Sequence, residues 1–493
     1  MTQTAPAILD DKSLWCCAGY IDGKWVSETA YGTYPVTNPA NGEVLALLPR
    51  CKEAETDAAI EAAERAFQSW RKTPAQHRAD ILRRWFDLVV AHKEDLARII
   101  TLEQGKPIRE ARGEIDYAAS FLRWFSEEAT RVRGDVIPAK LPSQRIVTLR
   151  QPVGVCAAIT PWNFPAAMIT RKAGPALAAG CTMVVKPASQ TPMAAFALAE
   201  LAERAGVPAG VFNVISGNDA RAIGGRLTGH DLIRKVTFTG STEVGRVLLE
   251  QSAATIKKCS MELGGNAPAL VFDDADLDNA VEGVMVAKFR NTGQSCVGAN
   301  RIFVQDGIYD AFAAKFAAKV AALQLGNGLD EASEVGPLID IGAVAKVEEH
   351  VADAVAKGAR VLTGGKPDAQ GGCFYQPTVL ADVTDEALLA KEETFGPLAA
   401  LFRFKDDAEA VARANDTEFG LAAYIFAKDA ARIWNAAEGI EAGIIGVNTG
   451  FISNETAPFG GVKQSGLGRE GSHLGIDEFL ETKYICWDGV TPY

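Results

Sequence analysis

Long apolar runs and an excess of positive charge are both missing from this chain. No stretch reaches the ~18 consecutive apolar residues of a membrane-spanning helix, and the nearest candidate, Ala176 to Val185, is interrupted. The 50 Lys+Arg residues are outnumbered by 62 Asp+Glu, and the net charge of −12 repels phosphate backbones and anionic lipids. We therefore expect neither a membrane partner nor a nucleic-acid partner.

The N-terminal segment also lacks the basic-then-apolar pattern of a secretory signal, because Asp10, Asp11 and Lys12 precede any apolar stretch. Nine cysteines, an odd number, include no C-x-x-C pair, which fits neither a disulfide framework nor a zinc knuckle. We expect a cytoplasmic protein with reduced thiols.

Two common catalytic motifs are absent as well. The five histidines are isolated and H-E-x-x-H does not occur, so no metal site is indicated. The segment Gly293-Gln-Ser-Cys-Val-Gly298 misses the G-x-S-x-G of serine hydrolases by one residue. Metal catalysis and serine hydrolysis are therefore not expected.

Helical and strand patterns alternate along the 493 residues. Apolar residues recur at helical spacing over 57–70, 78–102, 112–131 and 193–205. Short β-branched runs bounded by Gly or Pro predict strands at 154–160, 182–186, 211–215 and 236–239. This alternation predicts an α/β fold with a doubly wound parallel sheet.

The same pattern repeats after about Glu262, which predicts a second doubly wound unit. Its expected elements are strands at 269–272, 301–304, 361–363 and 398–404 and a helix at 309–323. From Arg145 to Arg150 polar and apolar residues alternate, as in a half-exposed strand that could pair with another strand or subunit.

Two glycine-containing segments are candidates for phosphate binding. Gly466-Leu-Gly-Arg-Glu-Gly471 matches G-x-G-x-x-G, but a glycine-rich loop precedes it instead of a strand, which favours a structural turn. Gly240-Ser-Thr-Glu-Val-Gly245 leaves a predicted strand and enters a predicted helix, so its free N–H groups could meet a phosphate. A plain strand–helix turn is an equal alternative for the second segment.

Four polar residues indicate a reaction centre. Small and polar residues before Cys296 would leave its thiol accessible. Glu262 lies among apolar and glycine neighbours, where desolvation would raise its pKa towards that of a general base. Asn163, between two prolines, is a rigid amide donor, and Lys186 ends a predicted strand where α/β sheets bind cofactors. A packed cysteine and a salt-bridged glutamate are the alternatives for the first two.

In order and spacing, these motifs resemble the aldehyde dehydrogenase superfamily from roughly Tyr20 to Tyr484. The resemblance rests on Thr160–Pro165, Lys186–Ala188, Gly240–Gly245, Glu262–Gly265, Gly293–Cys296 and Glu392–Pro397. Four further segments resemble bacterial succinate-semialdehyde dehydrogenases: Leu102–Pro107, Ile169–Pro175, Lys288–Asn291 and Ile452–Glu455.

The resemblance implies three parts and a covalent mechanism. Residues 1–131 and 151–261 would bind a nicotinamide cofactor, 262–465 would form the catalytic domain, and 132–150 with 466–493 would form an extension joining a homo-oligomer, a dimer or tetramer. The Cys296 thiolate would attack the aldehyde, Asn163 and the Cys296 N–H would hold the oxyanion, and hydride transfer would leave a thioester. Glu262 would then activate the hydrolytic water.

The resemblance also implies the ligand contacts. Lys186, also placed with the catalytic residues, and Glu393 would hold ribose hydroxyls. The whole expected cofactor set is Thr160, Trp162, Lys186, Ser189, Gly240, Ser241, Leu263, Glu393 and Phe395. Arg171 and Arg290 would hold the remote carboxylate of the substrate, with Ser453 as a further donor, because guanidinium groups bind carboxylates bidentately. An internal ion pair is the alternative for each arginine.

Ser189 bears on cofactor choice, because NAD-preferring members of the superfamily typically carry a glutamate there that would repel a 2′-phosphate. We expect NADP to be preferred and NAD to be possible, unless Ser189 only caps a helix beginning near Thr191. The expected reaction is oxidation of succinate semialdehyde to succinate. The alternatives are glutarate semialdehyde, one methylene longer, and a catalytically silent binding protein, which the intact set of polar residues disfavours.

Overall fold

The predicted parallel sheet is present in the computed structural model, which describes residues 5–490. Strands β11, β10, β7, β8 and β9 lie side by side in that order and run parallel, and antiparallel β19, β1 and β2 complete the edges. The bounds are β1 Gly19–Ile21, β2 Lys24–Val26, β7 Val155–Ile159, β8 Thr182–Lys186, β9 Phe212–Val214, β10 Ile233–Thr239, β11 Lys258–Glu262 and β19 Gly466–Leu467.

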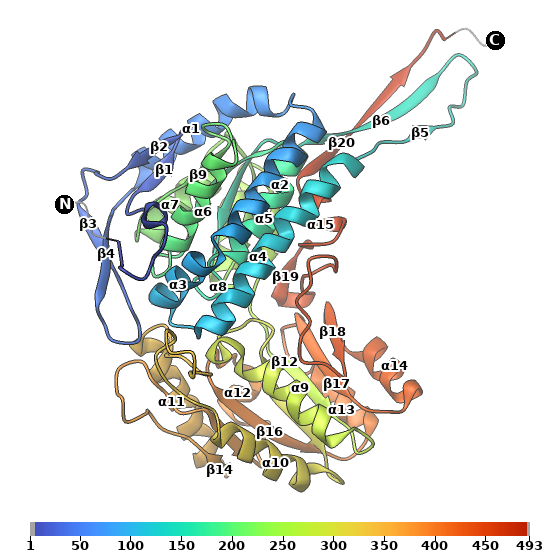
Figure 1. Cartoon of the computed structure of the whole chain (residues 1–493). Helices are drawn as coiled ribbons and strands as arrows, with labels where there is room; N and C mark the ends of the chain where they lie inside the picture. The colour runs from blue at the N-terminus through green and yellow to red at the C-terminus, as the bar shows by residue number, and fades with distance from the viewer. Residues whose placement is uncertain (1–4, 491–493) are drawn as a thin grey trace.

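Helices cover both faces of this sheet, so the central strands β7, β8 and β9 are buried on both faces along almost their whole length. On β7, Val155 and Ala157 pack with α1, α7 and α8, whereas Cys156 and Ala158 face the layer formed by α2 to α6. Figure 1 shows α2, α4 and α5 side by side in that layer. The bounds are α1 Glu53–Trp70, α2 Ala75–Ala91, α3 Lys93–Gln104, α4 Ile108–Glu128, α5 Ala167–Ala179, α6 Met193–Arg204, α7 Ala220–Gly229 and α8 Thr242–Ala253.

One predicted helix is wrong as a single element. The pattern over 78–102 belongs to two helices, α2 and α3, which meet at His92 with φ −102° and ψ 21°. Glu94 and Asp95 occupy the first turn of α3, where acidic side chains favour a new N-terminus. Asp95 also accepts hydrogen bonds from the N–H groups of Asp10 and Asp11, each at 2.8 Å, so tertiary contacts outside the helical pattern stabilise the break.

The second doubly wound unit is confirmed. Its sheet has the order β14-β15-β16-β13-β12-β17-β18, parallel except for β14. Helices α9 and α10 cover one face and α11, α13 and α14 the other. The strands are β12 Ala267–Val271, β13 Ala299–Gln305, β14 Arg360–Thr363, β15 Thr378–Ala381, β16 Leu398–Phe404, β17 Ala422–Phe426 and β18 Ile444–Val447. The helices are α9 Leu277–Phe289, α10 Tyr309–Ala321, α11 Ile341–Ala356, α12 Leu388–Lys391, α13 Asp407–Asn415 and α14 Ala430–Gly439.

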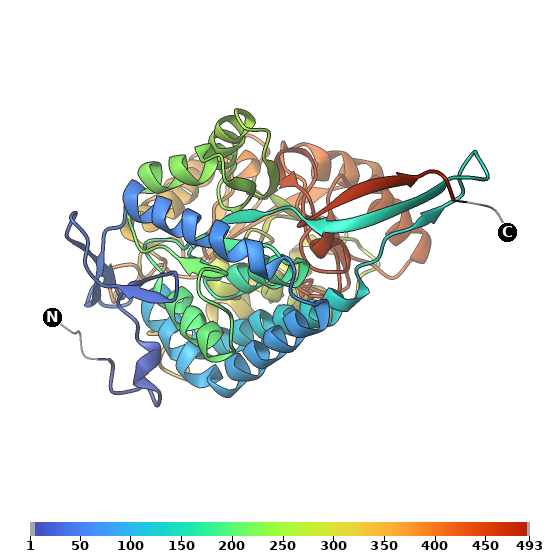
Figure 2. The same ribbon diagram turned by 90° about the horizontal axis from the view of Figure 1, so that it is seen from above.

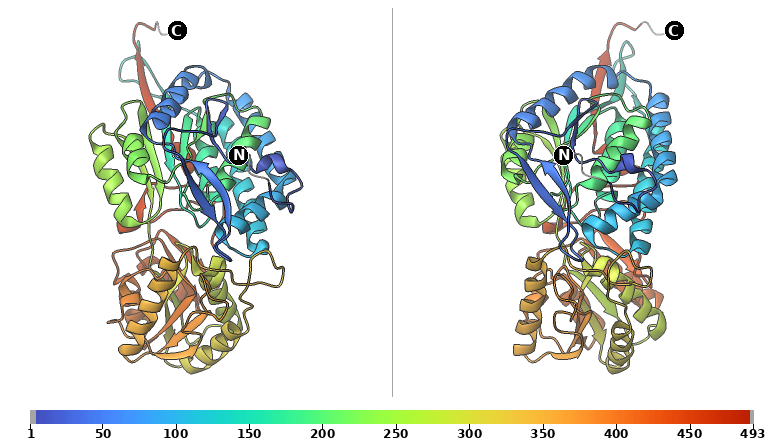
Figure 3. Two further views of the ribbon diagram at one scale, coloured as in Figure 1. Left: turned by 90° about the vertical axis from the view of Figure 1, so that its left-hand side faces the viewer. Right: turned by 60° about the vertical axis from the view of Figure 1, so that its left-hand side comes forward.

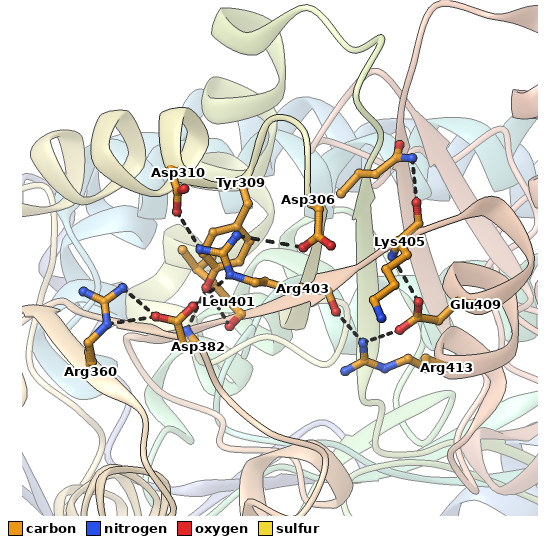
Figure 4. Close-up of polar contacts among 11 residues, drawn as sticks. Asp306, Tyr309, Asp310, Arg360, Asp382, Leu401, Arg403, Lys405, Glu409 and Arg413 are labelled. Atoms are coloured by element: carbon orange, nitrogen blue, oxygen red, sulfur yellow. Dashed lines mark hydrogen bonds and ion pairs between the residues drawn. The ribbon is translucent and has the colours of Figure 1, made fainter.

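A network around Arg403 holds the outer part of this second unit together (Figure 4). The Arg403 guanidinium lies 3.6 Å from the centroid of the Tyr309 ring and pairs with Asp310 at 2.6 Å and Asp382 at 3.0 Å. The Tyr309 hydroxyl donates to Leu401 O at 3.3 Å and accepts from Asp382 N at 2.7 Å. These contacts join α10 to β16 and to Asp382, the residue that follows β15, and they involve none of the predicted site residues.

A three-stranded antiparallel sheet projects from the first unit (Figures 1 and 3). Strand β6 lies between β5 and β20 and is half-exposed along its length, as the alternation near Arg145 predicts. The bounds are β5 Val136–Ile137, β6 Arg145–Pro152 and β20 Leu480–Trp487. A separate hairpin consists of β3 Thr33–Thr37 and β4 Val44–Pro49. Figure 2 shows the projecting strands extending away from the helical layers.

The segment 466–493, assigned from the sequence to the extension, begins inside the first sheet. Gly466 and Leu467 form β19 and pair with Glu262 and Met261 of β11. No helix follows directly, since the next one is the four-residue α15, Leu474–Asp477. The G-x-G-x-x-G match is thus a strand edge and loop. Among residues 5–490, no helix is long and apolar enough to cross a bilayer.

Candidate active site

A cavity of about 270 Å³ lies where the parallel strands of the first sheet end. Because β7, β8, β10 and β11 run parallel, the loops after them meet at one edge of the sheet. Only residues 263–266 separate β11 from β12, so this edge faces the second unit. The predicted site residues that line the cavity are Trp162, Asn163, Arg171, Gly240, Ser241, Leu263, Arg290, Cys296, Glu393, Phe395 and Ser453.

The cavity does not include every predicted residue. Thr160, Lys186, Ser189 and Glu262 are outside the lining. Conversely, Tyr117 on α4 and Lys346 on α11 line the cavity and were missed. Each belongs to an amphipathic helix far from the motifs in sequence, and nothing in the local sequence distinguishes it from a solvent-facing polar residue.

Cys296 follows a strained segment. Asn291, Thr292 and Gly293 have φ values of 52°, 59° and 74°, so three successive residues adopt the left-handed conformation. A Cβ on Gly293 would lie 2.1 Å from Gly396 O, which leaves no room for a side chain. The Gln294 carbonyl accepts a hydrogen bond from Asn163 Nδ2 at 3.0 Å, and this contact joins the cysteine segment to the β7–α5 loop.

Cys296 is half-buried and lines the cavity. Burial raises its pKa to about 12, with a further increase from the carboxylates of Glu393 and Glu262 and an opposing effect of Arg171. The expected access is therefore present, but at neutral pH the thiol holds its proton. A reaction at this sulfur needs a group that accepts that proton.

Glu262 is the last residue of β11 and is not part of the cavity lining, although the next two residues, Leu263 and Gly264, are. Neither carboxyl oxygen has a hydrogen-bond partner among the described residues, although the side chain is buried. Burial raises its pKa well above 4.5, the nearby Glu470 raises it further, and Arg171 and Lys172 oppose the shift. The desolvated carboxyl that the sequence predicts is confirmed, and its salt-bridged alternative is wrong.

Arg171 forms an internal ion pair, which is the alternative to substrate binding given above for this arginine. Its Nε pairs with Glu470, whose other oxygen pairs with Lys172 Nζ, and Lys172 also donates to Thr239 Oγ1 at 2.6 Å. The Arg171 guanidinium nevertheless lines the cavity and lies 4.0 Å from the Phe459 ring centroid. Glu470 thus neutralises part of the positive charge that Arg171 presents to the cavity.

Arg290 has a different environment. Its Nη1 donates to Ser453 Oγ at 3.1 Å, and its guanidinium lies 5.0 and 5.2 Å from the ring centroids of Phe164 and Phe451. The structure shows no carboxylate within ion-pair distance of it among residues 5–490. Tyr117 lines the same cavity, and its buried hydroxyl has no hydrogen-bond partner among residues 5–490. This end of the cavity suits an anion.

The residues expected at the cofactor lie around the neighbouring strand ends. Glu393 lines the cavity, and packing around its carboxyl raises the pKa to about 8. Lys346 Nζ donates to the Glu393 carbonyl at 2.5 Å. The rings of Trp162 and Phe395 meet edge to face, with centroids 5.5 Å apart.

Two buried polar groups beside the cavity fit a bound dinucleotide. Thr160 Oγ1 has no hydrogen-bond partner among residues 5–490. Lys186 Nζ donates to Pro187 O at 2.9 Å, and burial lowers its pKa to about 8. Hydroxyl and ammonium groups of this kind match ribose and phosphate oxygens.

The β10–α8 turn fits a phosphate, although its glycine has another purpose. Ser241 caps α8 and accepts from Val244 N at 3.4 Å, and Gly240 and Ser241 at this helix N-terminus line the cavity. A Cβ on Gly240 would lie 2.3 Å from Phe238 Cζ, which explains the glycine by packing.

Ser189 does not cap α6, so that alternative is wrong. The helix begins at Met193, and its first N–H groups, on Met193 and Ala194, donate to the Glu103 carboxyl at 2.7 and 3.0 Å. The half-exposed Ser189 hydroxyl instead contacts the side chain of Gln190 at 3.3 Å.

Comparisons with known proteins show the family of this chain. The aldehyde dehydrogenase family model matches residues 25–485. The chain is 61% identical over 482 residues to glutarate-semialdehyde dehydrogenase of Pseudomonas aeruginosa, covering 98% of this chain and 100% of that protein. It is also 61% identical over 478 residues to the NADP(+) succinate-semialdehyde dehydrogenase GabD of Escherichia coli, covering 97% and 99%.

A solved structure shows the same fold. A crystal structure of an E. coli NADP-dependent enzyme superimposes with a TM-score of 0.96 at 60% identity, covering 97% of this chain and 100% of that one. Family match, identity and fold agree over nearly the whole length. This chain is an oxidoreductase that belongs to the aldehyde dehydrogenase family.

Proposed function

We propose that this enzyme oxidises succinate semialdehyde to succinate, with NADP as its preferred cofactor. The observation that carries the proposal is that one cavity contains Cys296, Asn163 and the guanidinium of Arg290, which has no carboxylate partner among the described residues. A thiol, an amide donor and a cation in one cavity suit an aldehyde that ends in a carboxylate. A relative named as a succinate-semialdehyde dehydrogenase is 61% identical.

Cys296 is the proposed nucleophile and Asn163 the proposed oxyanion donor. One N–H of the Asn163 amide is held by Gln294 O, and its second N–H is available to an oxyanion formed when Cys296 Sγ bonds to the carbonyl carbon. The proton of the Cys296 thiol is proposed to pass to the unprotonated Glu262 carboxyl, which releases it to solvent before it serves the hydrolytic water. The Cys296 backbone N–H is the second proposed donor. A nicotinamide held by the expected cofactor residues would supply the hydride acceptor, and loss of the hydride would leave a thioester on Cys296.

Glu262 is the proposed base that takes a proton from the hydrolytic water. In the structure its carboxyl is not part of the cavity lining, so it has to turn towards the cavity to act. Two unpartnered oxygens make that rotation easy, because no hydrogen bond to a described residue is broken. Its raised pKa keeps it a strong enough base once it loses its proton.

Arg290, Ser453 and Tyr117 are proposed to hold the remote carboxylate, with Arg171 as a weaker partner because Glu470 already neutralises part of its charge. On the cofactor side, the expected set remains our proposal. Lys186 and Glu393 would hold ribose hydroxyls, and Ser189 carries no negative charge that would repel a 2′-phosphate.

Glutarate semialdehyde is the second candidate substrate, because a relative with that activity in its name is also 61% identical over nearly the whole chain. One methylene changes discrimination by only ~10- to 200-fold. The deciding experiment measures kcat/KM for succinate semialdehyde, glutarate semialdehyde and butanal with NADP and with NAD. We expect succinate semialdehyde with NADP to give the highest value. Butanal as the best substrate would contradict the anion site.

We also propose that the projecting sheet joins copies of this chain. Val136, Tyr484 and Trp487 are 80%, 61% and 69% exposed there, and such apolar exposure at sheet edges favours association. Light scattering with Trp487→Glu and Tyr484→Glu together tests this. A lower oligomer is expected, and an unchanged mass would contradict it.

A further inference from the structure

The loop between β7 and α5 contains the proposed oxyanion donor and is not part of a regular element. Residues 160–166 lie between the two elements, with Asn163 near the middle. A donor on such a loop is useful only if its backbone is fixed, because misplacement of a catalytic group by about 1 Å can lower the rate ~100-fold.

Two side chains fix the Asn163 backbone. Its carbonyl oxygen accepts from Lys106 Nζ at 2.7 Å and from Asn291 Nδ2 at 3.0 Å. Asn291 lies in the strained segment before Cys296 and also donates to Gln294 O at 3.1 Å. Its own N–H donates to Glu110 Oε2 at 2.6 Å.

Lys106 comes from the corner between α3 and α4 (Figure 1). Its Nζ pairs with Glu114 Oε2 at 2.6 Å, and both side chains are fully buried. The ammonium also lies 4.0 Å from the centroid of the Phe164 ring, next to Asn163. Gln104 Oε1 accepts from Lys106 N at 3.0 Å and fixes the main chain at this corner.

Glu114 holds the other end of the loop. Its Oε1 accepts from Ala166 N at 2.9 Å and from Ala167 N at 3.3 Å, where α5 begins. The Lys106–Glu114 pair therefore contacts the loop at Asn163 and again at the start of α5.

Stability alone does not explain this ion pair. Burying two charges has a large desolvation cost, and apolar residues of the same shape are often as stable or more stable. Unlike apolar packing, the pair makes directed hydrogen bonds that fix the geometry of the loop. The extended Lys106 side chain can donate to a carbonyl, and its partner can receive two helix N–H groups.

We propose that Lys106, held by Glu114, is a positioning residue that orients Asn163 towards the developing oxyanion. It does not touch the substrate and acts only through Asn163. This inference rests on the proposed role of Asn163. The proposal gives the segment Leu102–Pro107 a role in positioning the oxyanion donor. The sequence alone shows only that this segment resembles one subfamily.

A double-mutant cycle tests the proposal. The four enzymes are wild type, Lys106→Met, Asn163→Ala and the two changes combined, and each is measured with succinate semialdehyde and NADP. We expect Lys106→Met to lower kcat about 10- to 100-fold, with KM for NADP unchanged within threefold. In the Asn163→Ala background the same change should lower kcat less than threefold, because its target is gone. Equal losses in both backgrounds would overturn the proposal.

Two further variants separate positioning from folding. Lys106→Met combined with Glu114→Gln removes both charges and keeps an acceptor for Ala166 N, so it should fold if Lys106→Met alone does not. Lys235→Met is the matched control: Lys235 is also fully buried and pairs with Glu478 at 3.3 Å. It should lower the melting temperature while kcat stays within threefold. A loss of kcat for Lys235→Met as large as for Lys106→Met would also overturn the proposal.

The outcome also distinguishes this proposal from the proposed function. If Asn163→Ala itself keeps wild-type kcat, the oxyanion role fails. If Asn163→Ala loses activity while Lys106→Met does not, only the positioning role fails. Alkylation of Cys296 by iodoacetamide should proceed at the wild-type rate in Lys106→Met, because the thiol makes no contact with Lys106.

Discussion

Arg290 Nη1 donates to Ser453 Oγ at 3.1 Å, and this hydrogen bond joins the end of α9 to the loop after β18 at one end of the cavity. Ser453 uses its acceptor capacity on the arginine and keeps its own hydroxyl proton for a ligand. Both residues line the cavity, so their remaining donors are available to an anion bound there.

Removing the guanidinium should therefore affect charged aldehydes selectively. A charge-assisted contact is worth ~1.5–3 kcal/mol, which corresponds to about 10- to 100-fold in kcat/KM. We expect Arg290→Ala to lower kcat/KM for succinate semialdehyde by that factor and for butanal less than threefold. Equal losses for the two aldehydes would make the arginine a structural residue.

The Tyr117 hydroxyl should contribute to the same discrimination. It is a buried donor without a partner among residues 5–490, and a substrate carboxylate would satisfy it. Tyr117→Phe should raise KM for succinate semialdehyde about 3- to 10-fold and leave butanal unchanged. Tyr375→Phe is the matched control, because that hydroxyl is also buried and unpartnered but belongs to the core of the second unit. No effect of Tyr117→Phe would place the hydroxyl outside the anion site.

Cys296→Ala tests the nucleophile. The variant should fold and bind cofactor but lose turnover, because Cys296 is the one cysteine that lines the cavity within residues 5–490. Cys51→Ala, a change at a fully buried thiol, should keep turnover even if its melting temperature falls. Activity in Cys296→Ala comparable with that of Cys51→Ala would refute the assignment.

If Glu262 is the base, turnover should increase as the pH rises. Burial raises its pKa well above 4.5, so the unprotonated form that acts as a base increases as pH rises, and turnover should rise through that pKa. Glu262→Gln should show a burst of reduced cofactor followed by slow, pH-independent turnover. Glu250→Gln, an exposed change on α8, serves as control. Unchanged steady-state turnover in Glu262→Gln would exclude it as the base.

Ser189→Glu should reverse cofactor preference. A carboxylate about 4 Å from a 2′-phosphate costs about 4 kcal/mol at an effective dielectric near 20. The ratio of kcat/KM with NADP to that with NAD should fall at least 10-fold. Ser69→Glu, which adds the same charge on the exposed face of α1, should leave the ratio unchanged. A wild-type enzyme whose kcat/KM with NAD is at least as high as with NADP would contradict the argument.

The strand–helix alternation and the four polar motifs were predictable because both are local. Strand β7 is apolar on both faces, which periodicity detects, and Cys296 and Asn163 occur in distinctive segments. The break at His92 was not predictable, because residues 10 and 11 stabilise it from elsewhere in the chain. Tyr117 and Lys346 were missed for the same reason, since only packing turns them to the cavity.

The protonation states were only half predictable. The glycine and apolar neighbours of Glu262 indicated desolvation, and the structure agrees. For Cys296 the small neighbours indicated access but not the burial that raises its pKa to about 12. The sequence does not distinguish Arg171 from Arg290, because the ion-pair partner of Arg171 is Glu470, 299 positions later in the chain.

The distant caps of α5 and α6 constrain the order in which the chain can assemble. The N–H groups that begin these helices are satisfied by Glu114 and Glu103, at sequence separations of 52 and 90 residues, and not by their own flanking residues. Both glutamates precede the helices they cap, so during synthesis they leave the ribosome first. The N-termini of α5 and α6, the helices that follow β7 and β8, are thus capped only after α3 and α4 have docked. Translation from the N-terminus supplies the parts in that sequence, whereas a circular permutant opened between α4 and β7 would have to close both caps after the helices had formed.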